Sequence, residues 1–500
     1  MCGTCGACSP GVQPSAKVGL VSGPTEARPG DPLSPGAMSL AEAVRLVRTA
    51  RLGPSDRPTP DPAASDCLEI VAAPTRSGGN ASPGPGAVAR ALAAIEKSDQ
   101  RWRAWTYVDR AGALARAEVA ETELAGGRPA GRLEGLPIGV KDVIDVAGMP
   151  CTAGFAPFAN QVPTGHAPVV DRLVTAGAIV VGKTVTTQFA FSDPAASVNP
   201  WNVECTPGGS SSGSAVAVAV GHVPAALGTQ TSGSTIRPAA YTGIVGFKPS
   251  RGRLPLGGVF PLAWSIDEVG ILADTVETCV DVFQVAAGGA VAAATRDARI
   301  RVGLVEDAFE LATDEVADSV AGLGRILAAG GAELVSVRLG RLADIAAVHQ
   351  VTMSAEISAV HARGYAEHPT HYRTKIAQAV LAGREVRGRD YLDAQRLRRR
   401  LAAEVLAAFS EVDVWLLPSV AGVAPTRETT GDRSLQIPAS LLGLPAVSIP
   451  SGRSVVGLPI GAQLVAAPRC DELTLAVAAR VTRADDWAGR LSSPVSGVAS

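Results

Sequence analysis

Residues 207–249 read PGGSSSGSAVAVAVGHVPAALGTQTSGSTIRPAAYTGIVGFKP and contain two clusters of glycine and serine, at 208–214 and 231–234. Glycine lets the backbone approach a ligand closely, and serine supplies a hydroxyl that attacks or relays a proton. A serine nucleophile needs a base, and His222 is the one histidine near either cluster. Upstream, the segment GLPIGVKD places Lys141 among apolar residues. This combination predicts a hydrolase that uses serine and lysine.

The length and composition predict one large domain. The chain has 500 residues, of which 46% are hydrophobic, so it can bury a large core. Apolar periodic segments run almost unbroken from Ala87 to Trp487. The net charge is −2 and no basic patch stands out, so we expect no nucleic-acid partner.

Segments with strand character alternate with segments of helical periodicity. Strands are expected at 178–181, 300–305, 332–337, 412–417, 446–449 and 460–464. Helices are expected at 38–52, 111–125, 167–176 and over most of 340–410. This alternation predicts an α/β fold, a single large domain with a mixed central β-sheet covered by helices. The run AVAVAV at 215–220 stays open, because valine favours a strand whereas the preceding serines favour a helix start.

The composition also predicts where the folded domain begins and ends. Residues 1–36 are rich in Gly, Pro and Ser without periodicity, which predicts a flexible N-terminal tail. The catalytic domain is expected at 37–487, with a loop or linker-like insertion at 53–84. Residues 488–500 are expected to form a C-terminal tail.

The cysteines fall into two groups. Cys2, Cys5 and Cys8 form a C-x2-C-x2-C run, and three such thiols can hold zinc or an iron–sulfur cluster. No fourth ligand is evident, so we expect a cysteine-rich tail without a metal, and no cofactor elsewhere. The other five cysteines are scattered singly, which indicates reduced, mostly buried thiols.

No targeting or membrane segment is expected. The start MCGTCGACSPG lacks both a basic region and an apolar stretch typical of a signal peptide. No run approaches the roughly 18 apolar residues of a transmembrane helix. We therefore expect a cytoplasmic protein with no membrane partner.

Five segments together resemble the amidase signature family. They are GLPIGVKD at 135–142, PGGSSSGS at 207–214, GTQTSGSTIRPAAYTGIVGFKPSRGR at 228–253, GLPAVSIPSG at 443–452 and GLPIGAQLV at 457–465. The resemblance extends over roughly 38–485 and implies the amidase signature fold. It also implies hydrolysis of a carbon–nitrogen bond other than a peptide bond.

The resemblance implies a role for individual residues. Lys141 matches the family's base, Ser210 its bridging serine, held by a cis peptide bond, and Ser234 its nucleophile. The backbone N–H groups of the oxyanion hole map to Thr231, Ser232, Gly233 and Ser234. Ser211 is expected to steady the relay, and Phe189 matches the border of the acyl site, with a core role as the alternative.

The proposed trio is also coherent physically. Lysine has an ordinary pKa of about 10.4, so it is charged near neutrality and cannot act as a base. The neighbouring Leu136, Ile138 and Val140 provide an apolar setting, and burial disfavours the ammonium ion. Neutral Lys141 can then take a proton from Ser210, which takes one from Ser234.

Three positions depart from the commonest pattern of the family. Ser212 replaces a glycine, Gln230 replaces an aspartate, and Arg237 lies three residues after Ser234 instead of two. This variant of the loop resembles a subgroup of bacterial amidases. The departures leave hydrolysis intact but prevent a substrate from being carried over from relatives.

Three functions follow in order of preference. The first is an amidohydrolase that cleaves a small amide, carbamate or urea-like substrate through an acyl-enzyme, either alone or as a homodimer. The second is the glutaminase-type A subunit of a tRNA-dependent amidotransferase, which needs a partner protein. The third is an inactive scaffold, which the presence of Lys141, Ser210 and Ser234 disfavours.

Overall fold

The computed structural model describes residues 38–50, 86–289 and 299–483. The predicted tails at 1–36 and 488–500 and the predicted insertion at 53–84 lie outside the described residues. The C-x2-C-x2-C run lies outside them as well.

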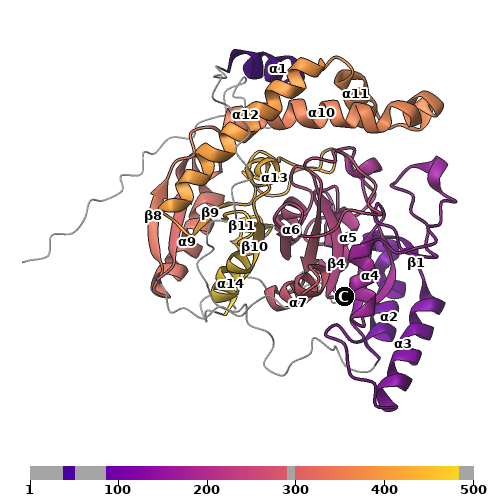
Figure 1. Cartoon of the computed structure of the whole chain (residues 1–500). Helices are drawn as coiled ribbons and strands as arrows, with labels where there is room; N and C mark the ends of the chain where they lie inside the picture. Colours follow the sequence, from indigo (N-terminus) through magenta and orange to yellow (C-terminus); the bar gives the residue numbers. More distant parts are fainter. Residues whose placement is uncertain (1–37, 51–85, 290–298, 484–500) are drawn as a thin grey trace, which may run out of the picture.

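In the described part of the chain, eleven strands form one sheet in the order β1-β3-β2-β4-β6-β5-β10-β11-β9-β7-β8 (Figure 1). The strands are β1 (Trp105–Val108), β2 (Pro137–Lys141), β3 (Ile179–Thr184), β4 (Ala225–Gln230), β5 (Val245–Lys248), β6 (Glu268–Ala273), β7 (Arg301–Val305), β8 (Glu333–Val337), β9 (Val414–Pro418), β10 (Ala446–Arg453) and β11 (Pro459–Ala466). β2 runs parallel to β3 and β4, and β7 runs parallel to β8 and β9, whereas the other neighbours are antiparallel. The predicted mixed sheet is confirmed.

Helices cover this sheet and form a further layer beside it. The α-helices are α1 (Leu40–Thr49), α2 (Ala87–Trp102), α3 (Arg110–Ala125), α4 (Pro168–Thr175), α5 (Ser212–Ala219), α6 (Ile236–Thr242), α7 (Val276–Ala286), α8 (Glu306–Phe309), α9 (Asp314–Ala329), α10 (Leu342–Glu367), α11 (Thr374–Gly383), α12 (Gly388–Ala407), α13 (Ile437–Leu442) and α14 (Asp471–Thr482). α6 and α14 pack on β10 and β11, and α7 packs on β6. α1, α11 and α12 pack around the long helix α10, above the sheet in Figure 1, and α10 also contacts α13.

The AVAVAV run is helical. α5 begins at Ser212, and its residues Ala215, Val216, Ala217 and Val218 are all buried. A helix that is buried on every side shows no amphipathic period, so the valines gave a misleading strand signal. Tertiary packing against β4, β2 and α6 decides the conformation instead.

The sequence patterns predicted the strands of the carboxyl-terminal half of the chain but missed β4, β5 and β6. The strands expected near 300, 332, 412, 446 and 460 are present as β7, β8, β9, β10 and β11. β4 and β5 carry no clear sequence signal, because AALGTQ and VGFK contain glycine, small and polar residues and no long apolar run. Cys151, Cys205 and Cys279 are free thiols, but Cys470 is disulfide-bonded, so the expectation of reduced cysteines is wrong at that position.

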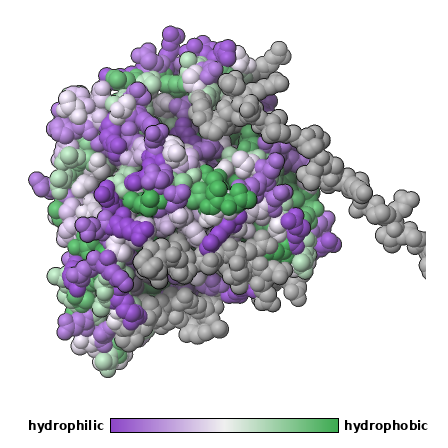
Figure 2. Space-filling view, turned by 180° about the vertical axis from the view of Figure 1, so that it is seen from behind, coloured by the Kyte–Doolittle hydropathy of each residue, from purple (hydrophilic) through white to green (hydrophobic). Residues whose placement is uncertain are grey.

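None of the described helices combines the length and the apolar composition that crossing a bilayer requires. Seen from behind, the surface is a mosaic of polar and apolar side chains, with a compact apolar area near the centre of the view (Figure 2).

The tight packing around Gly213, in the first turn of α5, predicts the effect of a substitution on stability. A Cβ atom there would lie 2.3 Å from both the Ala104 carbonyl oxygen and the Val185 nitrogen, which are backbone atoms that cannot rotate away. We expect Gly213→Ala to lower the free energy of unfolding by about 1–3 kcal/mol, measured by urea denaturation. Gly165→Ala is the control, since a Cβ at 165 would meet nothing within 4 Å. Equal stability of the two variants would contradict this packing.

Candidate active site

The two clusters of glycine and serine lie together at the carboxyl-terminal ends of strands β2 and β4. β2 and β4 are parallel neighbours, so Lys141 at the end of β2 lies beside the end of β4. The second Gly/Ser cluster follows β4 directly, and the first leads into α5. The Ser211 N–H donates to the Ser234 carbonyl at 3.3 Å, so the two serine loops are in direct contact.

Lys141 is fully buried and is held by hydroxyl groups. Its Nζ donates to Ser210 Oγ and to Thr229 Oγ1, both at 2.7 Å. Burial lowers the pKa of Lys141 well below its ordinary value, and the charge of Asp267 opposes this shift only in part. Within the described residues no carboxylate forms an ion pair with Lys141. The amine is therefore neutral at a much lower pH than an exposed lysine.

The Gly209–Ser210 peptide bond is cis, and Arg237 holds it in place. The Arg237 guanidinium donates to the Gly209 carbonyl through Nε at 3.2 Å and Nη2 at 2.6 Å. Its Nη1 donates to the Gly431 carbonyl at 2.7 Å. The displaced arginine thus connects the Ser210 loop to the segment between β9 and α13.

The loop that carries Ser234 is fixed by three residues that the sequence analysis did not identify. Thr231 Oγ1 donates to Asp267 at 2.5 Å, and the Thr231 carbonyl accepts from His349 Nε2 at 3.2 Å. The Ser232 carbonyl accepts from Ser440 Oγ at 2.6 Å. Asp267, His349 and Ser440 come from distant segments, so no local motif marks them.

These contacts leave the amides of the loop available. The N–H groups of Thr231, Ser232, Gly233 and Ser234 donate to no acceptor within the described part of the protein. Gly233 leaves room for Gln436, because a Cβ at position 233 would lie 2.2 Å from Gln436 Oε1 and would displace that side chain. Such a set of unpaired amides beside a serine is the arrangement that an oxyanion needs.

Gln230 stands where the family commonly has an aspartate, and it fixes the start of α6. Its Oε1 accepts the N–H groups of Thr235 and Ile236, at 2.9 and 3.0 Å. Its Nε2 donates to Ser440 Oγ at 2.9 Å, so one neutral side chain supports both α6 and the serine loop.

Ser234 is buried to 6% exposure but reaches the wall of a cavity of about 480 Å³. The structure shows no hydrogen bond between Ser210 and Ser234 among the residues it describes. Catalytic hydrogen bonds are often long in the absence of substrate and shorten in the complex. The geometry therefore joins Lys141 to Ser210 directly and places Ser234 on the adjoining loop.

Two further predicted residues lie near this centre but do not line the cavity. Ser211 Oγ bonds the Thr229 N–H and carbonyl, both at 3.2 Å, so it fastens the Ser210 loop to β4. Phe189 packs within a buried aromatic cluster that includes Phe155 and Tyr372, and its neighbour Phe191 lines the cavity instead. The core alternative therefore fits Phe189 better than the substrate-binding one.

The histidines near the site act as neutral, structural groups. Burial lowers the pKa of His349 to about 3 and that of His222 to about 4. His222 contacts Ser98 at 2.7 Å and accepts from Trp105 Nε1 at 3.1 Å, away from the serine loops. Neither histidine forms a hydrogen bond with Ser234 among the described residues.

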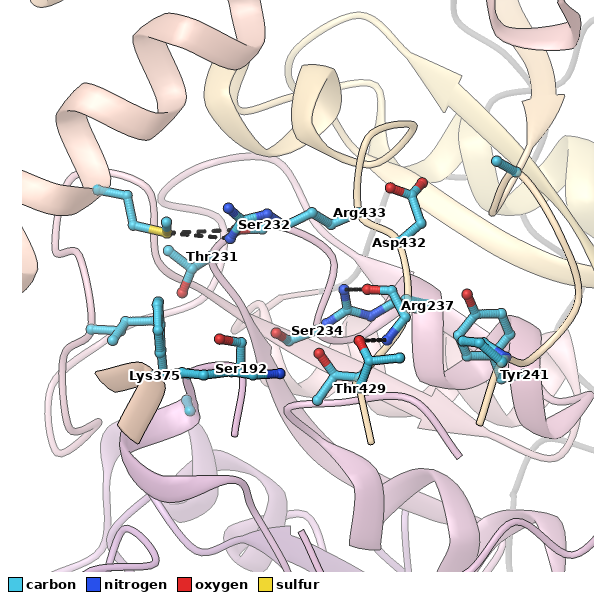
Figure 3. Close-up of a pocket in the computed structure, with 18 of the residues that line it drawn as sticks. Ser192, Thr231, Ser232, Ser234, Arg237, Tyr241, Lys375, Thr429, Asp432 and Arg433 are labelled. Carbon is cyan, nitrogen blue, oxygen red and sulfur yellow. Dashed lines mark hydrogen bonds between the residues drawn. The ribbon is translucent and has the colours of Figure 1, made fainter. Parts of the chain in front are cut away.

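The cavity lies between the sheet edge and the helical layer. Its walls come from the Ser234 loop, α6, the segment after β3, α10, α11 and the segment between β9 and α13. Figure 3 shows Ser234 between Ser192 and Thr429 on one side and Arg433 on the other. The described residues include no group of His, Cys, Asp or Glu that could hold a metal ion. A cavity of this size suits a small organic molecule.

Comparison with known proteins identifies the family. The amidase family model matches residues 86–475. The A subunit of the glutamyl-tRNA(Gln) amidotransferase of Roseiflexus castenholzii is 33% identical over 453 residues, which cover 80% of this chain and 92% of that protein.

Solved structures agree with this match. A crystal structure of an amidase superimposes with a TM-score of 0.74 at 31% identity, covering 89% of this chain and 99% of that one. The peptide amidase from Stenotrophomonas maltophilia gives a TM-score of 0.69 at 26% identity, covering 81% and 93%. The chain therefore belongs to the amidase signature family, whose members hydrolyse the carbon–nitrogen bonds of amides.

Proposed function

We propose that this protein hydrolyses a small amide, carbamate or urea-like substrate through an acyl-enzyme on Ser234. The observation that carries the proposal is the buried Lys141 amine, hydrogen-bonded to Ser210 on a loop that contacts the Ser234 loop. A buried amine without an acidic partner is a base, and a serine next to such a relay is a nucleophile.

The first half of the reaction forms a carbon–oxygen bond, breaks the carbon–nitrogen bond and passes a proton from Ser234 to the departing nitrogen. Neutral Lys141 accepts the proton of Ser210 through its lone pair, and Ser210 accepts the proton of Ser234. Ser234 Oγ attacks the carbonyl carbon and forms a tetrahedral intermediate. The proton then returns through Ser210 to the departing nitrogen, the carbon–nitrogen bond breaks, and the acyl group remains on Ser234 as an ester.

Water completes the cycle along the same path. It gives a proton to the relay, attacks the ester carbonyl, and releases the acid while Ser234 regains its proton. In both halves the negative oxygen faces the unpaired amides of Thr231 to Ser234. Each such donor contributes roughly 3–4 kcal/mol to stabilisation of the transition state in enzymes of this kind.

A second candidate function follows from the identity to amidotransferase subunits. The relative from Roseiflexus castenholzii is one component of a glutamyl-tRNA(Gln) amidotransferase, and such a role would require further subunits here. Copurification of this chain with additional subunits from its native host would favour that function. Hydrolysis of amides by the purified chain without any other subunit would favour the first function. We expect that enzyme in the cytoplasm, and light scattering would show whether it is a monomer or a homodimer.

The serine assignments predict distinct behaviour for two variants. Ser234→Ala should abolish turnover, whereas Ser210→Ala should lose roughly 10²–10⁴-fold in kcat, the usual worth of acid–base assistance, and keep a remnant. A fluorophosphonate probe followed by peptide mass spectrometry should place the adduct on Ser234.

Ser212→Ala is the matched control for both variants. Ser212 is a buried serine in the same cluster, and its hydroxyl has no hydrogen-bond partner in the described structure. It should keep nearly normal activity. An adduct on Ser210 with Ser234 unmodified would reverse the two roles.

The lowered pKa of Lys141 predicts the pH dependence of activity. Because the neutral amine is the active form, kcat/KM should rise with pH and level off well below the ordinary lysine value. Lys141→Ala should lose this acidic limb together with most of the activity, whereas Lys97→Ala, at an exposed position on α2, should retain it. A flat profile from about pH 6 to 10, with Lys141→Ala still active, would remove lysine from the mechanism.

A further inference from the structure

One wall of the cavity carries an arginine without an acidic partner. Arg433, in the segment between β9 and α13, lines the same cavity as Ser234. Its Nη2 donates to Gln350 Oε1 at 3.1 Å, and its Nη1 lies 3.9 Å from Met353 Sδ. Both partners are uncharged residues of α10. No carboxylate of the described residues lies within 4.0 Å of the Arg433 nitrogens.

Asp432 is the one acidic residue among those that line the cavity, and it does not pair with Arg433. Its carboxylate accepts hydrogen bonds from the Ser434 N–H and hydroxyl. Figure 3 shows this carboxylate directed away from the Arg433 guanidinium, and the Arg433 Nη1 contacts Met353 Sδ instead. The neighbouring negative charge is therefore already engaged.

The remaining charges make this cavity positive. Arg237 and Lys375 also line it, but the Arg237 guanidinium is occupied by the carbonyls of Gly209 and Gly431. Lys375 anchors the start of α11 through its backbone N–H, which donates to Asp193. Three cationic side chains and one carboxylate thus line the cavity. Arg433 has N–H groups that donate to no acceptor in the described part of the protein.

An arginine that has free N–H groups and no carboxylate partner can bind an anion from outside the protein. Burial lowers the pKa of Arg433, but a guanidinium stays charged over the physiological range. A desolvated charge is costly unless it is paired, and a guanidinium pairs best with a planar carboxylate through two parallel hydrogen bonds. Arg433 is partly buried and lines the cavity, so a carboxylate on a bound ligand can reach its free N–H groups.

We propose, on the basis of the proposed function, that Arg433 binds a carboxylate of the substrate, so that the preferred substrate is a small amide carrying a carboxylate elsewhere in the molecule. Gln350 and Met353 orient the guanidinium for this contact. A carboxylate fits better than a phosphate dianion, because the Asp432 charge shares the cavity.

The test compares matched pairs of substrates. The mono-amides of malonic, succinic and glutaric acid are set against propionamide, butyramide and pentanamide, which have the same chain lengths and no charge. For the best-fitting pair, wild-type kcat/KM should favour the anionic member by roughly 10- to 100-fold, the value of a charge-assisted hydrogen bond. Arg433→Met should abolish this ratio, and Arg433→Lys should keep part of it, since lysine retains the charge without the paired donors.

Lys375→Met is the matched variant, because it removes another cation of the same cavity. It should lower the ratio less than Arg433→Met does. Equal rates for anionic and neutral amides in the wild type would overturn the inference while leaving the proposed function in place. Loss of the preference in Lys375→Met but not in Arg433→Met would overturn it as well.

A binding measurement separates this inference from the proposed function. If the wild type hydrolyses no amide, the proposed function fails, and calorimetry of succinamate binding to Ser234→Ala protein then tests Arg433 alone. Binding that disappears in the Ser234→Ala, Arg433→Met double variant would support the carboxylate site. Absence of binding to Ser234→Ala, or equal binding to both proteins, would overturn it.

Discussion

The hydrogen bond between Lys141 Nζ and Ser210 Oγ constrains the rest of this structure. An amine that is fully buried and has only hydroxyl partners is stable as the neutral base, so the surrounding protein must exclude both water and acidic side chains. The apolar strand β2 and the buried helix α5 supply that environment. Ser211 and Arg237 then fix the Ser210 loop from two sides, through β4 and through the Gly209 carbonyl.

The topology of the sheet explains why this bond can form. β2 and β4 lie side by side in parallel, so their carboxyl ends coincide, although Lys141 and Thr229 are far apart in sequence. The helical layer around α10 closes the site from the other side (Figure 1). From α10, His349 holds the Thr231 carbonyl and Gln350 holds Arg433. The sheet therefore positions Lys141 beside the Ser210 loop, and the helical layer holds the Ser234 loop and one wall of the cavity.

The sequence predicted those parts of the site that are local. Lys141, Ser210 and Ser234 lie in short motifs whose residue types carry the chemistry, and the structure brings their segments together. Arg433 and His349 could not be predicted in this way, because each stands in an ordinary segment and gains its role only through tertiary contacts. The same limit applies to the fold, because strands with a run of large apolar residues, such as β9, were recognisable. The sequences of β4 (AALGTQ) and β5 (VGFK) contain glycine, small and polar residues, so no apolar run marks them as strands.

Two buried lysines differ in whether a carboxylate pairs with them. Lys183 is fully buried and lies 3.1 Å from the carboxylate of Asp142, so its charge has a partner. Lys141, equally buried, has none, and its pKa is lowered in the folded state. Between that lowered pKa and the ordinary lysine value the unfolded chain binds more protons, so stability rises with pH across this interval. At neutral pH the buried amine therefore destabilises the fold, and the extensive sheet core offsets that cost. Arg433, on the wall of the cavity that Ser234 lines, also has no carboxylate within 4.0 Å among the described residues, and under our proposal its partner is the carboxylate of the substrate.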